Sequence, residues 1–230
     1  MDYSYIDRNV ADIRARMRVA AESAGRDADV LLLAAIKSAD VGEIKYLHEA
    51  LGVNDVGENR VQQLMERYDL IKSDSLNIHF IGKLQTNKVK YIIDKVCMIH
   101  SLDSVKLAQQ IDTQAKKHGI VMDVLVEVNS GEEENKSGVL PDEVEAFCEE
   151  ISKFDSIRLR GFMTMAPKCE KKEEYCKYFS KTYQLVLDIW TKKLHNIDRP
   201  IISMGMSESF EEAIACGSDV VRVGRALFTK

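Results

Sequence analysis

The chain has 230 residues and a formal charge of -5, from 37 acidic and 32 basic side chains. These charges are mixed along the sequence, which excludes a basic field that would attract nucleic acid or an anionic membrane surface. No stretch approaches the roughly 20 apolar residues of a membrane span, and no apolar signal core stands near the start. Five scattered cysteines without Cys-x-x-Cys spacing favour reduced thiols over disulfides or zinc. We therefore expect a cytoplasmic protein that binds neither nucleic acid nor membrane.

Short apolar runs alternate with longer stretches of helical periodicity, and this rhythm predicts repeated βα units. In chain order the predicted elements are a helix at 4–24, strand 30–36, helix 41–51, strand 53–56, helix 59–72, strand 77–81, helix 86–94, strand 96–100, helix 104–118, strand 122–128, helix 141–153, strand 158–163, helix 171–194, strand 200–204, helix 208–216 and strand 219–223.

Local chemistry supports several of these boundaries. Asp40 with Glu43 and Ser209 with Glu212 each have the spacing of a capping box, in which side chain and backbone satisfy each other at a helix start. Pro141 suits a first helical turn. The segment 129–140 is the most polar connection, and its composition predicts a mobile loop at one mouth of the fold.

The strands are rich in Val, Ile and Leu with little alternation, as expected for a parallel sheet covered on both faces. Eight such strands predict an α/β fold, a (β/α)8 TIM barrel, formed by residues 1–230 as a single domain. An open doubly wound sheet is the alternative, but no Gly-x-Gly-x-x-Gly turn follows the first strand. Because the predicted elements leave no residues for a helix after the eighth strand, we expect the N-terminal helix to cover that flank.

The first candidate functional residue is Lys37. In parallel barrels the functional groups lie where strands end, and Lys37 directly follows the apolar run VLLLAAI. Desolvation at such a place disfavours the charged ammonium form, and the neutral amine is the form that attacks a carbonyl. Lys37 is therefore a candidate Schiff-base former. The alternative is an ordinary lysine that extends from a strand end into water.

Two glycine-containing turns follow the last two predicted strands. The first is SMGMS, Ser203 to Ser207, and the second is RVGR, Arg222 to Arg225. Glycine lets the backbone approach a ligand, and a hydroxyl with free N–H donors at a helix start suits an anion. Either turn alone is more often a helix cap, but two such turns after adjacent strands favour a phosphate site.

The histidines give a weaker signal. His79 lies in the third predicted strand, where it either contacts a ligand ring or is an ordinary core histidine with a backbone partner. The other histidines, His48, His100, His118 and His195, are single, so we expect no metal site.

Together these residues resemble the YggS/PROSC family of pyridoxal phosphate homeostasis proteins, whose fold is similar to the barrel domain of bacterial alanine racemase. The resemblance spans almost the whole chain. Its blocks are Lys37 after the first strand, GENRVQ at 57–62, HFIGKLQTNK at 79–88, VNSGEEENKSG at 128–138, RGFMTM at 160–165, SMGMSESFEEAI at 203–214 and VRVGRALF at 221–228.

The resemblance implies that pyridoxal 5'-phosphate (PLP) forms an imine with Lys37 and that Arg222 faces the pyridine nitrogen. An arginine has no acceptor and favours an unprotonated pyridine, which is a weaker electron sink than a pyridinium. It also implies that Lys136 can accept the cofactor during transfer. The other residues that we expect to bind the cofactor are Asn59, His79, Met163, Ser203, Ser207, Gly224 and Arg225.

Three positions depart from the family pattern. Arg225 stands where relatives usually have a small hydroxyl residue, Ile36 stands where they often have Ser or Thr, and Thr229 replaces a usual Gly. The side chain at 225 therefore either strengthens the phosphate site or points to solvent, whereas backbone contacts survive in both cases.

The resemblance implies a monomeric PLP carrier that buffers free cofactor and hands it to apo-enzymes. A PLP-dependent amino-acid racemase with Lys37 as base is the alternative. It needs a second acid or base that alanine racemases bring from an extra domain, and we expect no such domain here. A third reading is a cofactor-free aldolase in which Lys37 attacks a sugar phosphate directly.

Overall fold

Eight parallel strands form a closed barrel in the part of the chain that the structure describes. The structure is a computed structural model, and it describes residues 2–26, 29–133, 135–192 and 199–230. The strands pair in chain order and β1 also pairs with β8, which closes the barrel and confirms the predicted (β/α)8 fold. Their bounds are β1 Leu31–Ala35, β2 Asp55–Glu58, β3 Asn77–Phe80, β4 Met98–Leu102, β5 Met122–Val128, β6 Ile157–Thr164, β7 Ile201–Ser203 and β8 Val220–Val223.

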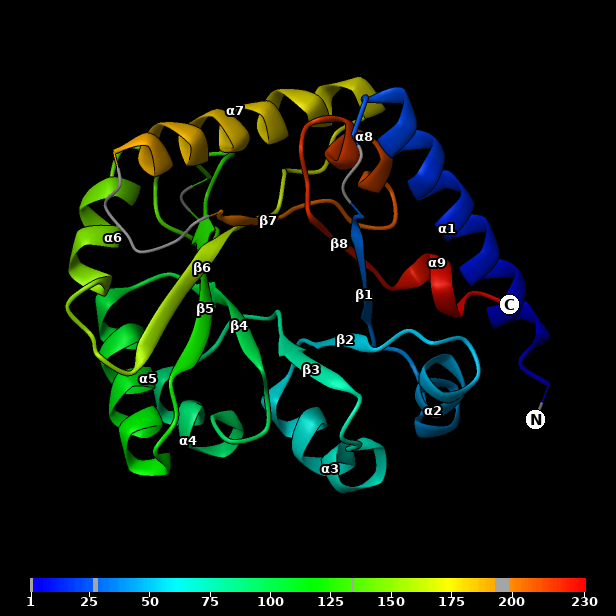
Figure 1. The fold of residues 1–230 in the computed structure, drawn as a ribbon, viewed down its shortest axis with the longest axis horizontal. Coiled ribbons are helices and arrows are strands. Elements are labelled where there is room, and N and C mark those ends of the chain that lie inside the picture. Colours follow the sequence, from blue (N-terminus) through cyan, green and yellow to red (C-terminus); the bar gives the residue numbers. More distant parts are fainter. Residues whose placement is uncertain (1, 27–28, 134, 193–198) are drawn as a thin grey trace.

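Helices cover the outside of the barrel (Figure 1). They are α1 Ser4–Ser23, α2 Val41–Glu49, α3 Val61–Ile71, α4 Val89–Ile92, α5 Val105–His118, α6 Val144–Ile151, α7 Lys172–Thr191, α8 Phe210–Ala215 and α9 Arg225–Phe228, with the 3-10 turn η1 Thr86–Lys88 before α4. Of the helix predicted at 171–194, positions 193–194 lie outside the described residues.

Strands β2 and β4 begin two residues later than predicted. The apolar character of Val53 predicts a strand start, but its N–H donates to the carbonyl of Leu47 and so completes the end of α2. At the other end, β2 includes Gly57 and the buried carboxylate of Glu58. A buried ion pair with Arg67 lets that carboxylate lie within the strand.

Two of the predicted helix signals were wrong and one is confirmed. The capping box between Asp40 and Glu43 is present. Pro141 precedes α6 by a turn, because that helix begins only at Val144. Ser209 makes no side-chain cap within the described residues, since its hydroxyl accepts from the N–H of Met206 instead.

Helix α1 covers the flank beside β8, as predicted. It packs against α8 and α9, and Figure 1 shows the blue α1 beside the red α9. Asn9 of α1 donates to the carbonyls of Leu227 and Thr229 at 3.0 and 2.8 Å, and Arg16 pairs with Glu211 at 2.9 Å. The expectation of no helix after the eighth strand was wrong, because α9 forms one turn there.

The core has two parts. The main cluster lies between the outer faces of the strands and the helices, and it includes the outward residues Leu32 and Ala34 of β1. A separate small cluster contains Leu33 with Ile81 and Val220. Because strand side chains alternate between faces, Leu33 points into the barrel. The barrel interior is therefore filled by side chains, as in other parallel barrels.

Candidate functional site

A pocket of about 220 Å³ lies at the carboxyl ends of the strands. The closed barrel brings β1, β2, β7 and β8 to one rim, so residues far apart in the sequence meet there. Its lining includes six residues that the sequence singled out: Lys37, Asn59, Ser207, Arg222, Gly224 and Arg225.

Helix α3 holds the backbone around Lys37. The side-chain amide of Gln63 donates to the carbonyl of Lys37 at 2.8 Å. The guanidinium of Arg67 donates to the carbonyls of Ile36 and Ala39 at 3.0 and 3.1 Å. The side chain of Lys37 itself is exposed at the pocket. Its backbone is thus fixed on both sides while its amine stays accessible to a ligand.

Arg67 is in turn held by Glu58. The two side chains form a buried ion pair, and the other carboxylate oxygen of Glu58 accepts from the N–H groups of Asn59 and Arg60. Glu58 therefore supports the rim and does not face the pocket. The amide oxygen of Asn59 is buried without a partner among the described residues, and it lies at the pocket. An unpaired buried oxygen of this kind is available to a ligand.

The turns after β7 and β8 meet at Ser207. Its hydroxyl accepts from the N–H groups of Gly224 and Ala226, both at 3.3 Å. A Cβ at position 224 would lie 2.8 Å from the carbonyl oxygen of Ala35, so this close approach of β8 to β1 requires glycine. Gly205 has a φ of 93°, a conformation that side chains disfavour. Because the hydroxyl of Ser207 accepts both N–H groups, its own proton is free to donate to a ligand, which suits a phosphate group.

Arg222 lies at the floor of the pocket and is almost fully buried. Its guanidinium donates to the hydroxyl of Ser203 at 2.7 Å and to the carbonyl of Thr164 at 2.9 Å. Burial lowers the pKa of Arg222 to about 10, against the opposing charge of Glu127. The side chain therefore remains a donor at neutral pH.

The other sequence-selected residues lie elsewhere. Among the described residues, His79, Met163 and Ser203 are buried and do not line this pocket. Ser203 contacts Arg222, whereas His79 contacts His100 and Asp55.

Two basic residues of interest are exposed. Arg225 pairs with Glu208 at 2.6 Å, and 78% of its side chain is exposed. Lys136 is exposed in the loop that follows β5. The neighbouring Ser137 donates to the buried Glu127 at 2.8 Å, which ties this loop to the barrel.

Sequence reasoning missed several residues that support the site, notably Arg67, His100, Glu127 and Thr164. A signal existed for Arg67, because it stands on the same helix face as the buried Leu64 and Ile71. A charged residue at such a position requires a buried partner, and Glu58 is that partner.

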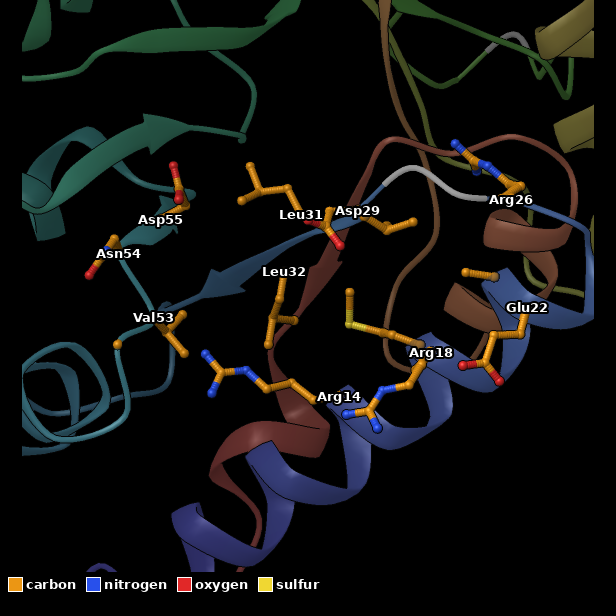
Figure 2. A pocket seen from close by; sticks show the side chains of 14 residues that line it. Arg14, Arg18, Glu22, Arg26, Asp29, Leu31, Leu32, Val53, Asn54 and Asp55 are labelled. Atoms are coloured by element: carbon orange, nitrogen blue, oxygen red, sulfur yellow. The ribbon is translucent and has the colours of Figure 1, made fainter.

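A larger pocket of about 700 Å³ lies at the opposite end of the barrel, where the strands begin. Figure 2 shows it between α1 and the starts of β1 and β2, with Arg14, Arg18 and Asp55 around it. The candidate site therefore does not coincide with this larger cavity. Among the described residues, no cluster of His, Cys, Asp or Glu could hold a metal ion. No described helix has the length and apolar character needed to span a membrane.

Comparison with known proteins first gives the class. Residues 8–230 match the family model described as "Alanine racemase, N-terminal domain", so the protein is a racemase-type β/α barrel. The chain is 41% identical to the pyridoxal phosphate homeostasis protein of Aquifex aeolicus over 93% of this chain and 92% of that protein. It is 36% identical to the protein of the same name from Pseudomonas aeruginosa, over 98% and 95% of the two chains. The chain therefore belongs to the family of pyridoxal phosphate homeostasis proteins.

Solved structures agree with this placement. PipY of Synechococcus elongatus, in a structure described as having PLP bound, matches with a TM-score of 0.83 and 26% identity, over 97% of this chain and 100% of that one. An alanine racemase of Clostridium difficile matches with a TM-score of 0.76 and 20% identity, over 99% of this chain and 57% of that one. The second likeness concerns the fold alone.

Proposed function

We propose that this chain is an intracellular PLP-binding protein that holds the cofactor as a Schiff base on Lys37 and catalyses no robust reaction of its own. The observation that carries the proposal is the meeting of Lys37, Ser207 and Arg222 around one pocket. In this proposal the amine binds the aldehyde of PLP, the hydrogen-bond donors near Ser207 bind its phosphate, and the buried guanidinium faces its ring nitrogen. The names of the Aquifex and Pseudomonas relatives and the PLP-bound PipY support the same assignment.

Each rim residue has a role in this proposal. Bound PLP supplies an aldehyde that an amine captures reversibly. The amine of Lys37 would hold the cofactor through that aldehyde. Ser207, together with the backbone of Gly224 and Arg225, holds the phosphate. Asn59 offers its free amide oxygen to a donor on the ligand.

Arg222 is the reason to expect weak catalysis. A guanidinium donates and does not accept, so it favours an unprotonated pyridine nitrogen. Carbanion chemistry needs the stronger electron sink of a pyridinium. His79, Met163 and Ser203 belong to the proposal as residues that shape or support the pocket from within the barrel.

The wider role follows from the carrier function. We propose that the protein acts as a cytoplasmic monomer with one domain over residues 1–230, that it buffers free PLP, and that it hands the cofactor to apo-enzymes. The exposed Lys136 is the proposed acceptor during transfer.

A PLP-dependent racemase is the second candidate, because the barrel resembles that of alanine racemase. Incubation of the purified protein with PLP separates these readings. A carrier gives a stoichiometric imine absorbance and no racemisation of a panel of amino acids above the rate of free PLP. Robust turnover that depends on Lys37 would support the racemase. Absence of any imine would exclude both and favour a cofactor-free aldolase.

A further inference from the structure

A chain of polar side chains crosses the interior of the barrel. His79, Ser203 and Arg222 each stand between two residues of the main core, so alternation points all three into the barrel. His100 joins them from β4 and is 1% exposed. Barrel interiors are usually packed with branched apolar residues. A buried polar row is costly unless every member is paired, and here the members pair with one another.

Four hydrogen bonds connect five residues. The Nη1 of Arg222 lies 2.7 Å from the Oγ of Ser203, and that Oγ lies 3.3 Å from the Nδ1 of His100. The Nε2 of His100 lies 3.0 Å from the Nδ1 of His79. The Nε2 of His79 then lies 3.1 Å from the Oδ1 of Asp55. This row of hydrogen-bonded side chains thus runs from the candidate PLP pocket to the start of β2.

The two end residues, Arg222 and Asp55, determine in which direction each group of the row donates its hydrogen bond. A guanidinium only donates and a carboxylate only accepts, whereas a hydroxyl and a neutral imidazole each offer a donor and an acceptor. Burial, together with the charge of Arg222, holds the pKa of His100 well below its usual range, so its ring is neutral. Ser203 accepts from Arg222, so its own proton is donated to the Nδ1 of the neutral His100. The Nε2 of His100 then donates to the Nδ1 of His79, and the Nε2 of His79 donates to Asp55. This order requires the proton of each histidine to be on Nε2.

We propose that Asp55, His79, His100 and Ser203 are positioning residues that orient Arg222 at the PLP pocket through this one-directional chain. The role of Arg222 toward the ring nitrogen rests on the proposed function, whereas the proton order does not. The negative end of the chain, Asp55, lies beside the larger pocket at the far end of the barrel (Figure 2). This row of hydrogen bonds therefore connects the carboxylate of Asp55 to the buried guanidinium of Arg222, although the two side chains do not touch.

The proton order has a direct readout in the protein without PLP. Nitrogen-15 NMR of the imidazole rings distinguishes the Nε2–H tautomer, the Nδ1–H tautomer and the imidazolium, and single His→Gln variants assign the signals. We expect the Nε2 of His79 and of His100 to carry the proton and the Nδ1 of each ring to accept a hydrogen bond. An Nδ1–H ring or an imidazolium at His100 would overturn the proposal, because either reverses the link to Ser203.

The positioning role is tested by two variants of His100. His100→Gln keeps one donor and one acceptor, whereas His100→Leu removes both. We expect His100→Leu to weaken PLP binding about tenfold and to shift the imine absorbance, while His100→Gln retains the wild-type spectrum. A folded His100→Leu protein with unchanged affinity and spectrum would contradict the proposal. If His100→Leu does not fold, the NMR result decides. If wild-type protein forms no imine, the proposed function fails, and the tautomers still decide the proton order.

Discussion

The guanidinium of Arg67 and the carboxylate of Glu58 form a buried ion pair beside the turn that carries Lys37. Arg67 also donates to the carbonyls of Ile36 and Ala39, on either side of that turn. The position of the candidate imine-forming lysine therefore depends on a residue of helix α3 that does not line the pocket.

Replacing Arg67 by Met is expected to destabilise the protein strongly. It leaves the carboxylate of Glu58 buried without a counter-charge, and loss of one partner of a buried pair costs about 3–5 kcal/mol. The double variant Glu58→Gln with Arg67→Met should recover part of that loss. Denaturant unfolding measures both values. Lys72→Met, which removes an exposed pair with Asp69, is the control and should change the free energy of unfolding little. Equal effects of Arg67→Met and Lys72→Met would contradict this account.

Ser207→Ala tests the phosphate site. The hydroxyl of Ser207 accepts from the N–H groups of Gly224 and Ala226 and lines the pocket. We expect the dissociation constant for PLP to rise about tenfold, since one hydrogen bond to a charged group is lost. Pyridoxal, which has no phosphate, serves as the control ligand and should bind both proteins equally. A parallel loss of affinity for both ligands would show that Ser207 does not contact the phosphate.

Arg225→Ser places a small hydroxyl residue at position 225. The side chain of Arg225 is 78% exposed and pairs with Glu208, and exposed ion pairs contribute little. PLP affinity, measured by fluorescence titration, should therefore change less than about twofold. A tenfold loss would instead place the guanidinium on the phosphate.

Much of this architecture is predictable from local patterns. Apolar strands at regular spacing indicate a parallel barrel, and the rule that function lies at strand ends selects Lys37, Ser207 and Arg222. The shifted starts of β2 and β4 were not predictable in this way, because the N–H groups of Val53 and Val96 donate to carbonyls of the preceding helices, although both residues have the apolar character of strand residues.

The polar chain in the barrel interior is harder to predict. Its four links join residues that are 24, 21, 103 and 19 positions apart, and they exist only because the strands close into a ring. Sequence alone marks His79 and His100 as isolated histidines. Their pairing becomes evident only from the inward register of β3 and β4.

The buried neutral His100 predicts a dependence of stability on pH. Burial, together with the charge of Arg222, lowers its folded pKa well below the usual 6.5. The unfolded state then binds the proton more tightly, so stability is fully present above pH 6.5 and falls as the pH drops below it, by up to about 1.4 kcal/mol per pH unit. His100→Gln should flatten this slope in denaturant unfolding between pH 7 and 5. An unchanged slope would mean that His100 does not titrate as a buried group.

The central claim is that Lys37 is the residue that captures PLP. Borohydride reduction of the PLP-treated protein, followed by peptide mass spectrometry, tests it directly, with Lys37→Arg and Lys136→Arg as a matched pair. We expect a stoichiometric pyridoxyl group on Lys37, its loss in Lys37→Arg and its retention in Lys136→Arg. A stoichiometric adduct that persists in Lys37→Arg, or that maps to another lysine in the wild-type protein, would contradict the account.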